Sequence, residues 1–154
     1  MASSRRKDYS SHPGTLTHPT LSIGLVALGP SHCVAAGVGN CRVYRRRAKR
    51  WSVIVPDQTL GTVATDLRNA LPAEFASEPS QVLGFQPSVK PVFWDDARQR
   101  DDVFVLCSVG VWAGFHEVIV SHTGDIDALL ALPESLVASA SSAARPASAC
   151  VLTP

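Results

Sequence analysis

The sequence lacks several features that would place it in a functional class at once. No apolar run approaches the ~20 residues of a membrane-spanning helix, and the N-terminus has no apolar core of a secretory signal. The 14 Lys and Arg nearly balance the 13 Asp and Glu, so a formal charge of +1 does not indicate nucleic acid or an anionic membrane as partner. These absences favour an intracellular protein, cytoplasmic by default, that does not contact a membrane.

The sequence also lacks a zinc or redox motif. Its four cysteines, Cys33, Cys41, Cys107 and Cys150, form no C-x-x-C pair. Three of them lie in apolar, strand-like runs, which is typical of buried thiols in a reducing compartment.

The length and composition predict one folded domain. The chain has 154 residues, of which 45% are hydrophobic and 18% charged, far from the composition of a disordered protein. Residues 1–20 differ, because they are rich in Ser, Arg and His with Asp8 as their one acidic residue. We expect a disordered tail there, although its composition weakly resembles an organellar transit peptide. Residues 21–153 form the expected domain.

Strand and helix patterns are mixed along this domain. Apolar or alternating runs bounded by Gly and Pro predict strands at residues 21–27, 32–38, 42–46, 51–55, 89–94, 103–107 and 149–152. Helical spacing of apolar residues predicts helices at 59–71 and 126–140, with shorter ones at 73–76 and 117–121. Pro133 is expected to kink or break its helix, and residues 95–100 to form a charged turn.

The run at residues 103–107 is the most apolar of these strands. It ends in Ser108-Val109-Gly110, so it reads as a buried strand that stops at a turn. Many enzymes place a metal-binding carboxylate at such a turn. Val109 occupies the middle position here, and its side chain has no atom that binds a metal.

Four short motifs, in this order, resemble the metal-dependent protein phosphatase 2C family. Residues 37–44 are similar to the family's Val-Gly-Asp-Ser-Arg hairpin, and residues 56–59 to its Asp-His-Ser stretch before a helix. Residues 105–112 resemble its apolar strand followed by Ser-Asp-Gly-Leu-Trp-Asp, and residues 145–152 its terminal Arg-Asp-Asn and apolar strand. The resemblance covers roughly residues 20–153.

The resemblance implies an α+β fold, a partial αββα sandwich of two mostly antiparallel sheets flanked by helices. It also implies two divalent metals, manganese or magnesium, held between the sheets by carboxylates, with a bridging water that attacks the phosphoester.

The chain departs from the family at the metal-binding positions. Asn40, Val109, Ala113 and Pro146 stand where the family has Asp. The family's early Asp and Asp-Gly positions and its phosphate-binding Arg have no counterpart before residue 21. We therefore expect no metal cofactor and no catalytic residue.

The function expected from these departures is that of a catalytically inactive phosphatase-like protein, a protein-interaction or regulatory module. An incomplete sandwich would expose sheet edges or an apolar face, so we expect another protein as partner. Two alternatives stay open. One is an active serine/threonine phosphatase whose metal site is rebuilt from Asp57, Asp66, Asp95 and Asp102, and the other is a structural subunit of a large assembly.

One dense basic run is a candidate contact for phosphate or a partner, and residues 42–50 would be the route to RNA. A solvated hairpin edge guarded by charge is the alternative interpretation. The arginines of interest are Arg42, Arg45, Arg46 and Arg47.

Other polar residues are interpreted as ordinary surface or turn residues. His116 and His122 are too poorly spaced to share a metal with His32, Asp125 and Asp127. Ser108 lacks the first glycine of a nucleophile elbow and is read as a turn serine. Asp95, Asp96, Asp101 and Asp102 are expected on a charged surface turn.

Overall fold

Two antiparallel sheets form the centre of the protein in a computed structural model, which describes residues 20–66, 71–84, 87–141 and 147–153. The three-stranded sheet has the order β1-β2-β5 and the four-stranded sheet the order β4-β3-β6-β7. This α+β arrangement of two antiparallel sheets confirms the expected fold class. The strands are β1 (Ile23–Leu28), β2 (His32–Val38), β3 (Arg42–Arg47), β4 (Arg50–Val55), β5 (Val92–Ala97), β6 (Val103–Cys107) and β7 (Ala149–Leu152).

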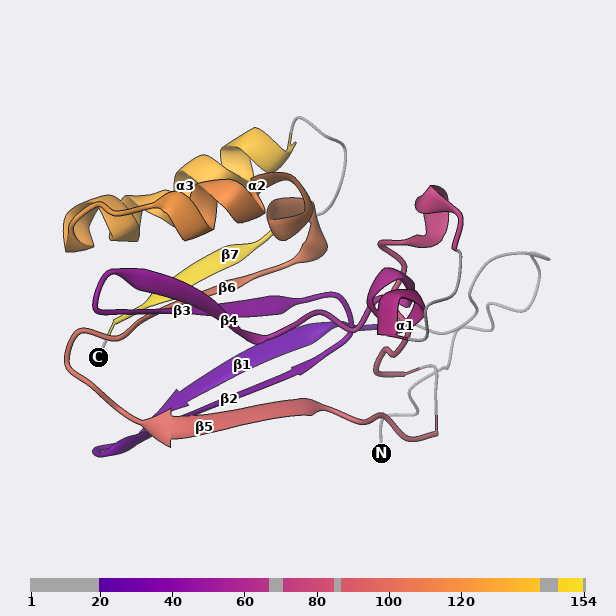
Figure 1. Ribbon diagram of the computed structural model, residues 1–154, viewed down its shortest axis with the longest axis horizontal. Coiled ribbons are helices and arrows are strands. Elements are labelled where there is room, and N and C mark those ends of the chain that lie inside the picture. Colours follow the sequence, from indigo (N-terminus) through magenta and orange to yellow (C-terminus); the bar gives the residue numbers. More distant parts are fainter. Residues whose placement is uncertain (1–19, 67–70, 85–86, 142–146, 154) are drawn as a thin grey trace, which may run out of the picture.

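Two helices, α2 (Val109–Ser121) and α3 (Ile126–Ser141), cover the outer face of the four-stranded sheet (Figure 1). The short helix α1 (Leu60–Asp66) and a 3-10 turn (Ala73–Phe75) lie at one end of the sandwich. Among the described residues, no helix covers the outer face of the three-stranded sheet (Figure 1). The helical layer is thus one-sided. None of the helices in the described ranges is long and apolar enough to cross a membrane.

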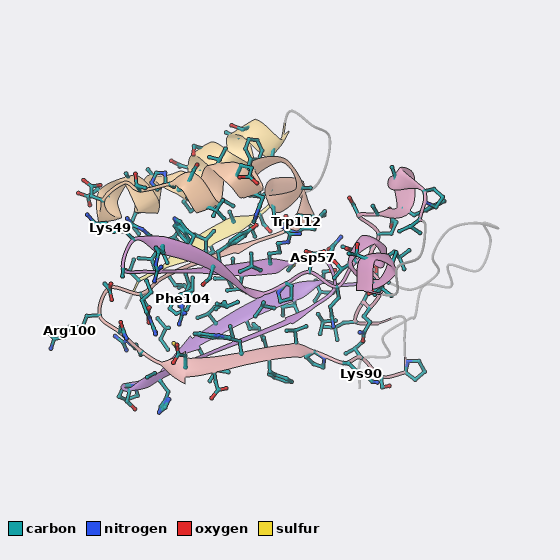
Figure 2. All side chains as sticks on the ribbon, in the orientation of Figure 1. Lys49, Asp57, Lys90, Arg100, Phe104 and Trp112 are labelled. Carbon is teal, nitrogen blue, oxygen red and sulfur yellow. The ribbon has the colours of Figure 1, made fainter. Side chains whose placement is uncertain are left out.

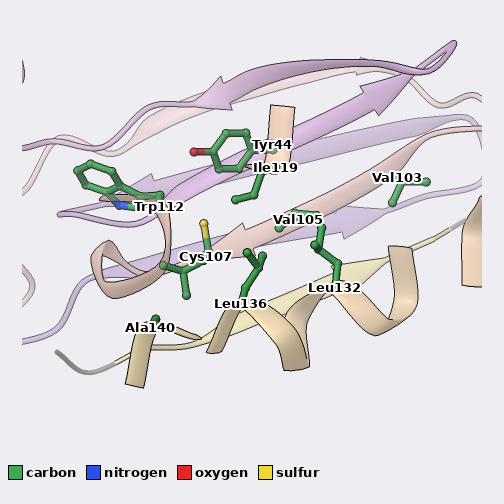
Figure 3. Packing of buried hydrophobic residues seen from close by; sticks show 10 residues of the cluster. Tyr44, Val103, Val105, Cys107, Trp112, Ile119, Leu132, Leu136 and Ala140 are labelled. Atoms are coloured by element: carbon green, nitrogen blue, oxygen red, sulfur yellow. The ribbon is translucent and has the colours of Figure 1, made fainter. Parts of the chain in front are cut away.

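The four-stranded sheet separates two hydrophobic cores. Phe104 is fully buried and packs with Val43 and Val55 between the sheets. On the other side of the sheet, Val105 and Tyr44 pack beneath the helices (Figure 3). Because β6 is central and covered on both faces, alternate side chains serve opposite cores and the strand is apolar throughout.

The β3–β4 hairpin turns through two residues with left-handed backbone. Arg47 pairs with Arg50, and between them Ala48 has φ 49° and Lys49 has φ 61°. Two-residue hairpin turns of this kind favour Asn and Gly, which accept positive φ at little cost. Ala and Lys therefore hold a strained conformation, maintained by the pairing of the two strands and by the hydrogen bond from the N–H of Ala48 to Asp101 Oδ2 at 3.0 Å.

Several predicted boundaries differ from the structure. β5 begins and ends three residues later than the predicted strand 89–94, so Asp95 and Asp96 belong to a strand and not to a charged turn. Helix α2 begins immediately after Ser108, and the prediction of 117–121 found only its second half. Helix α3 continues through Pro133, so the predicted break is wrong.

Some predictions fall outside the described residues. The predicted disordered tail covers residues 1–20, of which 1–19 are not described, and the helix expected at 59–71 is described as far as residue 66. Pro146 is also outside the described ranges. The proposed domain boundary at residues 21–153 stays a prediction.

Candidate functional site

Two loops that are far apart in the sequence meet at the end of β6. Ser108 precedes α2, and its carbonyl oxygen accepts hydrogen bonds from the backbone N–H groups of Val111 and Trp112 at 3.0 and 3.1 Å. The indole Nε1 of Trp112 donates to the carbonyl oxygen of Asn40 at 2.7 Å. The start of α2 is therefore tied to the β2–β3 loop, as the resemblance requires.

A glycine lets the β2–β3 loop lie against Ser22, the residue before β1. Gly39 has φ +87°, and a Cβ built there would lie 2.1 Å from Ser22 Oγ. The hydroxyl oxygen of Ser22 in turn accepts a hydrogen bond from the backbone N–H of Asn40 at 3.2 Å. Any side chain at position 39 would push the β2–β3 loop away from Ser22.

The chain segment before β7 reaches the same place. The backbone N–H of Ser108 donates to the carbonyl oxygen of Ser148 at 3.0 Å, and the N–H of Ser148 donates to Ser108 Oγ at 3.0 Å. Ser148 lies two residues after Pro146. The fold thus brings together the segments that carry Asn40 and Val109 with the one that follows Pro146.

The side chains at these positions do not suit a metal. Val109 packs against the core beneath the helices, and Ala113 is an exposed alanine on α2. The adjoining hollow of about 290 Å³ offers hydroxyls, thiols and backbone but no carboxylate. Mg²⁺ and Mn²⁺ prefer charged oxygen ligands, so the residues present do not fit the metal pair of the family. The polar side chains that line the hollow are those of Ser22, Cys41, Cys107, Ser108, Ser148 and Cys150.

Two of the thiols that line this hollow, Cys41 and Cys107, are not activated. Burial raises the pKa of Cys107 to about 12, and burial also raises the pKa of Cys41. Cys33 is fully buried, whereas Cys150 is exposed, unlike the buried thiol expected for an apolar run. All four cysteines are free.

The carboxylate nearest to this region is committed to an arginine. Asp57 is 3% exposed, and Arg42 Nε donates to its Oδ1. Its Oδ2 accepts from the hydroxyls of Thr59 at 2.8 Å and Thr62 at 3.2 Å. The Arg42 guanidinium lies 3.8 Å from the ring centroid of Trp112, and Figure 2 shows Asp57 and Trp112 on neighbouring parts of the molecule. Asp57 fixes the loop before α1 to β3.

Two more arginines of the basic run join the sheets. Arg45 Nη1 and Arg47 Nη1 donate to Asp96 Oδ2 at 2.7 and 2.9 Å. Arg47 also binds both carboxylate oxygens of Asp102, each at 2.7 Å. The guanidinium of Arg45 lies 4.8 Å from the ring centroid of Trp94. This network crosses from β3 to β5, so the run is not the solvated hairpin edge considered above.

The prediction from the sequence is wrong for Asp102. It was expected on a charged surface turn, yet its side chain is fully buried. Burial raises its pKa, but hydrogen bonds from Arg47 and from the backbone N–H of Gln99 outweigh this effect and hold the pKa below its ordinary value. The one sequence signal was its position directly before the most apolar strand.

The fourth arginine holds the connection between the two long helices. Arg46 is 8% exposed, and its Nη2 donates to the carbonyl oxygens of Thr123 and Gly124 at 3.2 and 3.0 Å. All four guanidinium groups thus have partners inside the protein. Whether they also contact phosphate or a partner stays a prediction.

The histidines and acids do not assemble into a metal site. Nδ1 of His116 lies 3.0 Å from the hydroxyl of Tyr44, whose pKa burial raises to about 12. His32 lies on β2, and Asp125 Oδ1 accepts from the backbone N–H of Ala128 at the start of α3. Within the described ranges, no three His, Cys, Asp or Glu side chains gather where they could hold a metal ion.

No family model matches the sequence, and no curated protein matches it either. Solved structures do match the fold. PppA of Pseudomonas aeruginosa has a TM-score of 0.65 and 18% identity, over 84% of this chain and 55% of that chain. The serine/threonine phosphatase PstP of Mycobacterium tuberculosis has a TM-score of 0.64 and 17% identity, over 84% and 57%. MsPP, a PPM Ser-Thr phosphatase of Mycobacterium smegmatis, has a TM-score of 0.65 and 18% identity, over 90% of this chain and 63% of that chain.

These likenesses show a protein phosphatase 2C-like fold. The chain spans 55% to 63% of the length of these three structures. At such low identity the comparison concerns the fold alone.

Proposed function

We propose that this protein has lost metal-dependent phosphatase catalysis and acts as an interaction or regulatory module. The observation that carries this proposal is the chemistry at the end of β6. The carbonyl of Asn40 is hydrogen-bonded to Trp112 of α2, the helix that begins at Val109, and no carboxylate lines the hollow formed by the neighbouring residues Cys41 and Ser108. Val109 contributes to the core instead. A hard divalent cation would find one neutral amide oxygen and a few hydroxyls there.

A rebuilt metal site has less support. Asp57 is satisfied by Arg42, Thr59 and Thr62, and Asp102 by Arg47. Asp95 is exposed on β5 and belongs to neither group. The side chain of Asp66 lies outside the described part of the chain.

A regulatory role is in keeping with one of the similar structures. PppA is described as a key regulatory component of the T6SS of Pseudomonas aeruginosa. For this chain, the loss of carboxylates leaves binding as the activity that a phosphatase-like scaffold retains. The partner we propose is another protein.

The test is hydrolysis of p-nitrophenyl phosphate and of a phosphoserine peptide by the purified protein with Mn²⁺ or Mg²⁺, with PstP as the positive control. We expect turnover no greater than in EDTA, and no metal-dependent rise in the unfolding temperature. Metal-dependent turnover that co-elutes with the protein and falls in an Asp57→Asn variant would overturn the proposal.

A further inference from the structure

The outer face of the three-stranded sheet carries three exposed large hydrophobic side chains. Leu25, Val34 and Phe93 are 55%, 43% and 70% exposed there. Leu25 pairs with Ala36, and Ala36 pairs with Phe93. Leu25, Ala36 and Phe93 therefore form one row across β1, β2 and β5. The small Ala36 stands between two large side chains, which leaves room for one apolar side chain of a partner.

This face carries one formal charge. Ala27, Val34 and Asp95 form the next row, and His32 lies beyond it at the end of β2. Asp95 is the one charged residue at the outward positions of the three strands. A partner therefore needs an apolar stripe with a Lys or Arg beside it. We call this surface the outer sheet face: Leu25, Ala27, His32, Val34, Ala36, Phe93 and Asp95.

The size of the outer sheet face argues against a second copy of the chain as its occupant. Three strands about 4.8 Å apart and about 20 Å long make a surface of roughly 14 by 20 Å. That is near 300 Å², well below the roughly 800 Å² per partner of a stable dimer, so the face suits a contact with one secondary-structure element better than a dimer of two sheets. Two flat sheets in contact would gain little. An α-helix, with its diameter of about 10 Å, covers such a face along its whole length.

The protein itself shows how such a face is covered. On the four-stranded sheet, α2 and α3 bury Ile119, Leu132 and Leu136 against the strands (Figures 1 and 3). The sequence of residues 1–19 lacks the apolar pattern of such a helix. Their apolar residues are Met1, Ala2, Tyr9 and Leu16, which make no helical stripe, and the segment includes Pro13 and Pro19.

We propose that the outer sheet face is the docking site for an amphipathic α-helix of a partner protein, with a cation of that helix opposite Asp95. This inference rests on the proposed function, since it names the surface through which the interaction module binds. Leu25 and Phe93 flank the helix, and an apolar side chain of the partner enters above Ala36.

The probe is a fluorescent Leu–Lys peptide of about 18 residues with Leu at helical spacing, long enough to form a helix when bound. A peptide of the same composition with scrambled order is its control. Anisotropy titrations compare the wild type with Phe93→Ser, Leu25→Ser and Asp95→Lys. Phe75→Ser and Leu130→Ser are matched controls, because those side chains are 48% and 53% exposed on other surfaces.

We expect the helical peptide to bind saturably and the scrambled peptide not to bind. Phe93→Ser or Leu25→Ser should weaken binding of the helical peptide about tenfold, because each removes an apolar contact that the peptide would bury. Asp95→Lys should weaken binding while leaving the apolar area intact, and the two control variants should bind as the wild type does. Absent binding, equal binding of the scrambled peptide, or equal loss in the controls overturns the proposal. A concentration-dependent dimer that Phe93→Ser abolishes does so too, in favour of a second copy.

The two proposals fail separately. Metal-dependent phosphatase turnover contradicts the proposed function whether or not the peptide binds. Failure of the peptide to bind an inactive protein contradicts the docking site alone.

Discussion

Arg47 on β3 binds Asp102, directly before β6 of the same sheet, through a buried ion pair. Both carboxylate oxygens accept from Arg47 at 2.7 Å, and Asp102 Oδ2 also accepts from the N–H of Gln99 at 2.9 Å. The hydrogen bonding of Arg47 to the carboxylate of Asp102 is the largest cause of the raised pKa of Arg47. Arg47 reaches Asp96 of the other sheet as well. Removing the carboxylate would leave a guanidinium with half of its partners.

We predict that Asp102→Asn lowers the free energy of unfolding by about 3 kcal/mol at neutral pH, because it breaks a buried pair on one side. The folded pKa of Asp102 is depressed. Its contribution is therefore present above the unfolded pKa of about 3.9 and is lost as pH falls through the folded pKa. Urea unfolding from pH 7 down to about pH 3 should show a steeper loss for the wild type than for the variant.

Asp95→Asn is the matched control, since Asp95 is exposed and lies next to Asp96 on β5. Its unfolding free energy should stay within about 0.5 kcal/mol of the wild type. Equal losses in the two variants would contradict the role given to Asp102.

The sequence could not reveal this pair. Charged residues are usually exposed, so four acids around a turn read as surface. The partner Arg47 lies 55 residues away, and no local pattern connects the two. The departures at Asn40 and Val109, by contrast, were visible in the sequence, because they fall within short motifs whose order the fold preserves.

At the scale of elements, α3 holds the helical layer to the sheet. Leu132 and Leu136 are 6% and 2% exposed in the core beneath the helices, while Leu130 on the same helix is 53% exposed. Its Pro133 lacks a backbone N–H, which ordinarily ends a helix. Packing against α2 and β7 keeps the helix continuous.

We predict that Leu136→Ala costs about 3 kcal/mol of unfolding free energy, as large-to-small changes in a packed core do. Leu130→Ala on the exposed side should cost less than about 0.5 kcal/mol. Chemical denaturation followed by circular dichroism measures both. If Leu136→Ala proved as mild as Leu130→Ala, α3 would not be anchored as described.

Strands whose sequence shows both the apolar run and the turn residues at its two ends were predicted well. β6 and β7 were predicted at their observed bounds, because each is a short apolar run between clear turn residues. β5 and α2 were displaced. The sequence places Asp95 and Asp96 in a turn because Asp is common in turns, whereas in the structure Arg45 and Arg47 bind Asp96 on β5. The Gly- and aromatic-rich start of α2 has weak helix propensity.

At the scale of the whole molecule, the described residues cover both faces of the four-stranded sheet and one face of the three-stranded sheet. β3 and β6 are the central strands of the doubly covered sheet. They contribute Val43, Tyr44 and Phe104, all fully buried. The stability of the protein should therefore be uneven, and highest in these two strands.

Hydrogen exchange followed by mass spectrometry tests this expectation. We predict that amides of β3 and β6 exchange at least about tenfold more slowly than those of β5, which is an edge strand with an open face. Uniform protection across both sheets would contradict it. Addition of a helical ligand for the outer sheet face should slow exchange in β5 selectively.

The fold class followed from the order of four motifs and the mixture of strands and helices. From the sequence we expected an incomplete sandwich to expose sheet edges or an apolar face, without knowing which sheet would lack a helical layer. The face itself depends on strand register, which placed Leu25, Ala36 and Phe93 in one row. Register is set by pairing between distant segments and is not written in any one of them.

The placement of the three tryptophans gives the molecule a built-in optical readout. Trp94 lies edge-on to Phe104 between the sheets, at 6.4 Å between ring centroids. Trp112 beneath Arg42 and Trp51, whose Nε1 donates to the carbonyl of His122 at 2.8 Å, both lie on the helical side. Single-tryptophan variants would thus give separate emission signals from the two cores, so a loosening of one sheet could be followed without labels while the other stays intact.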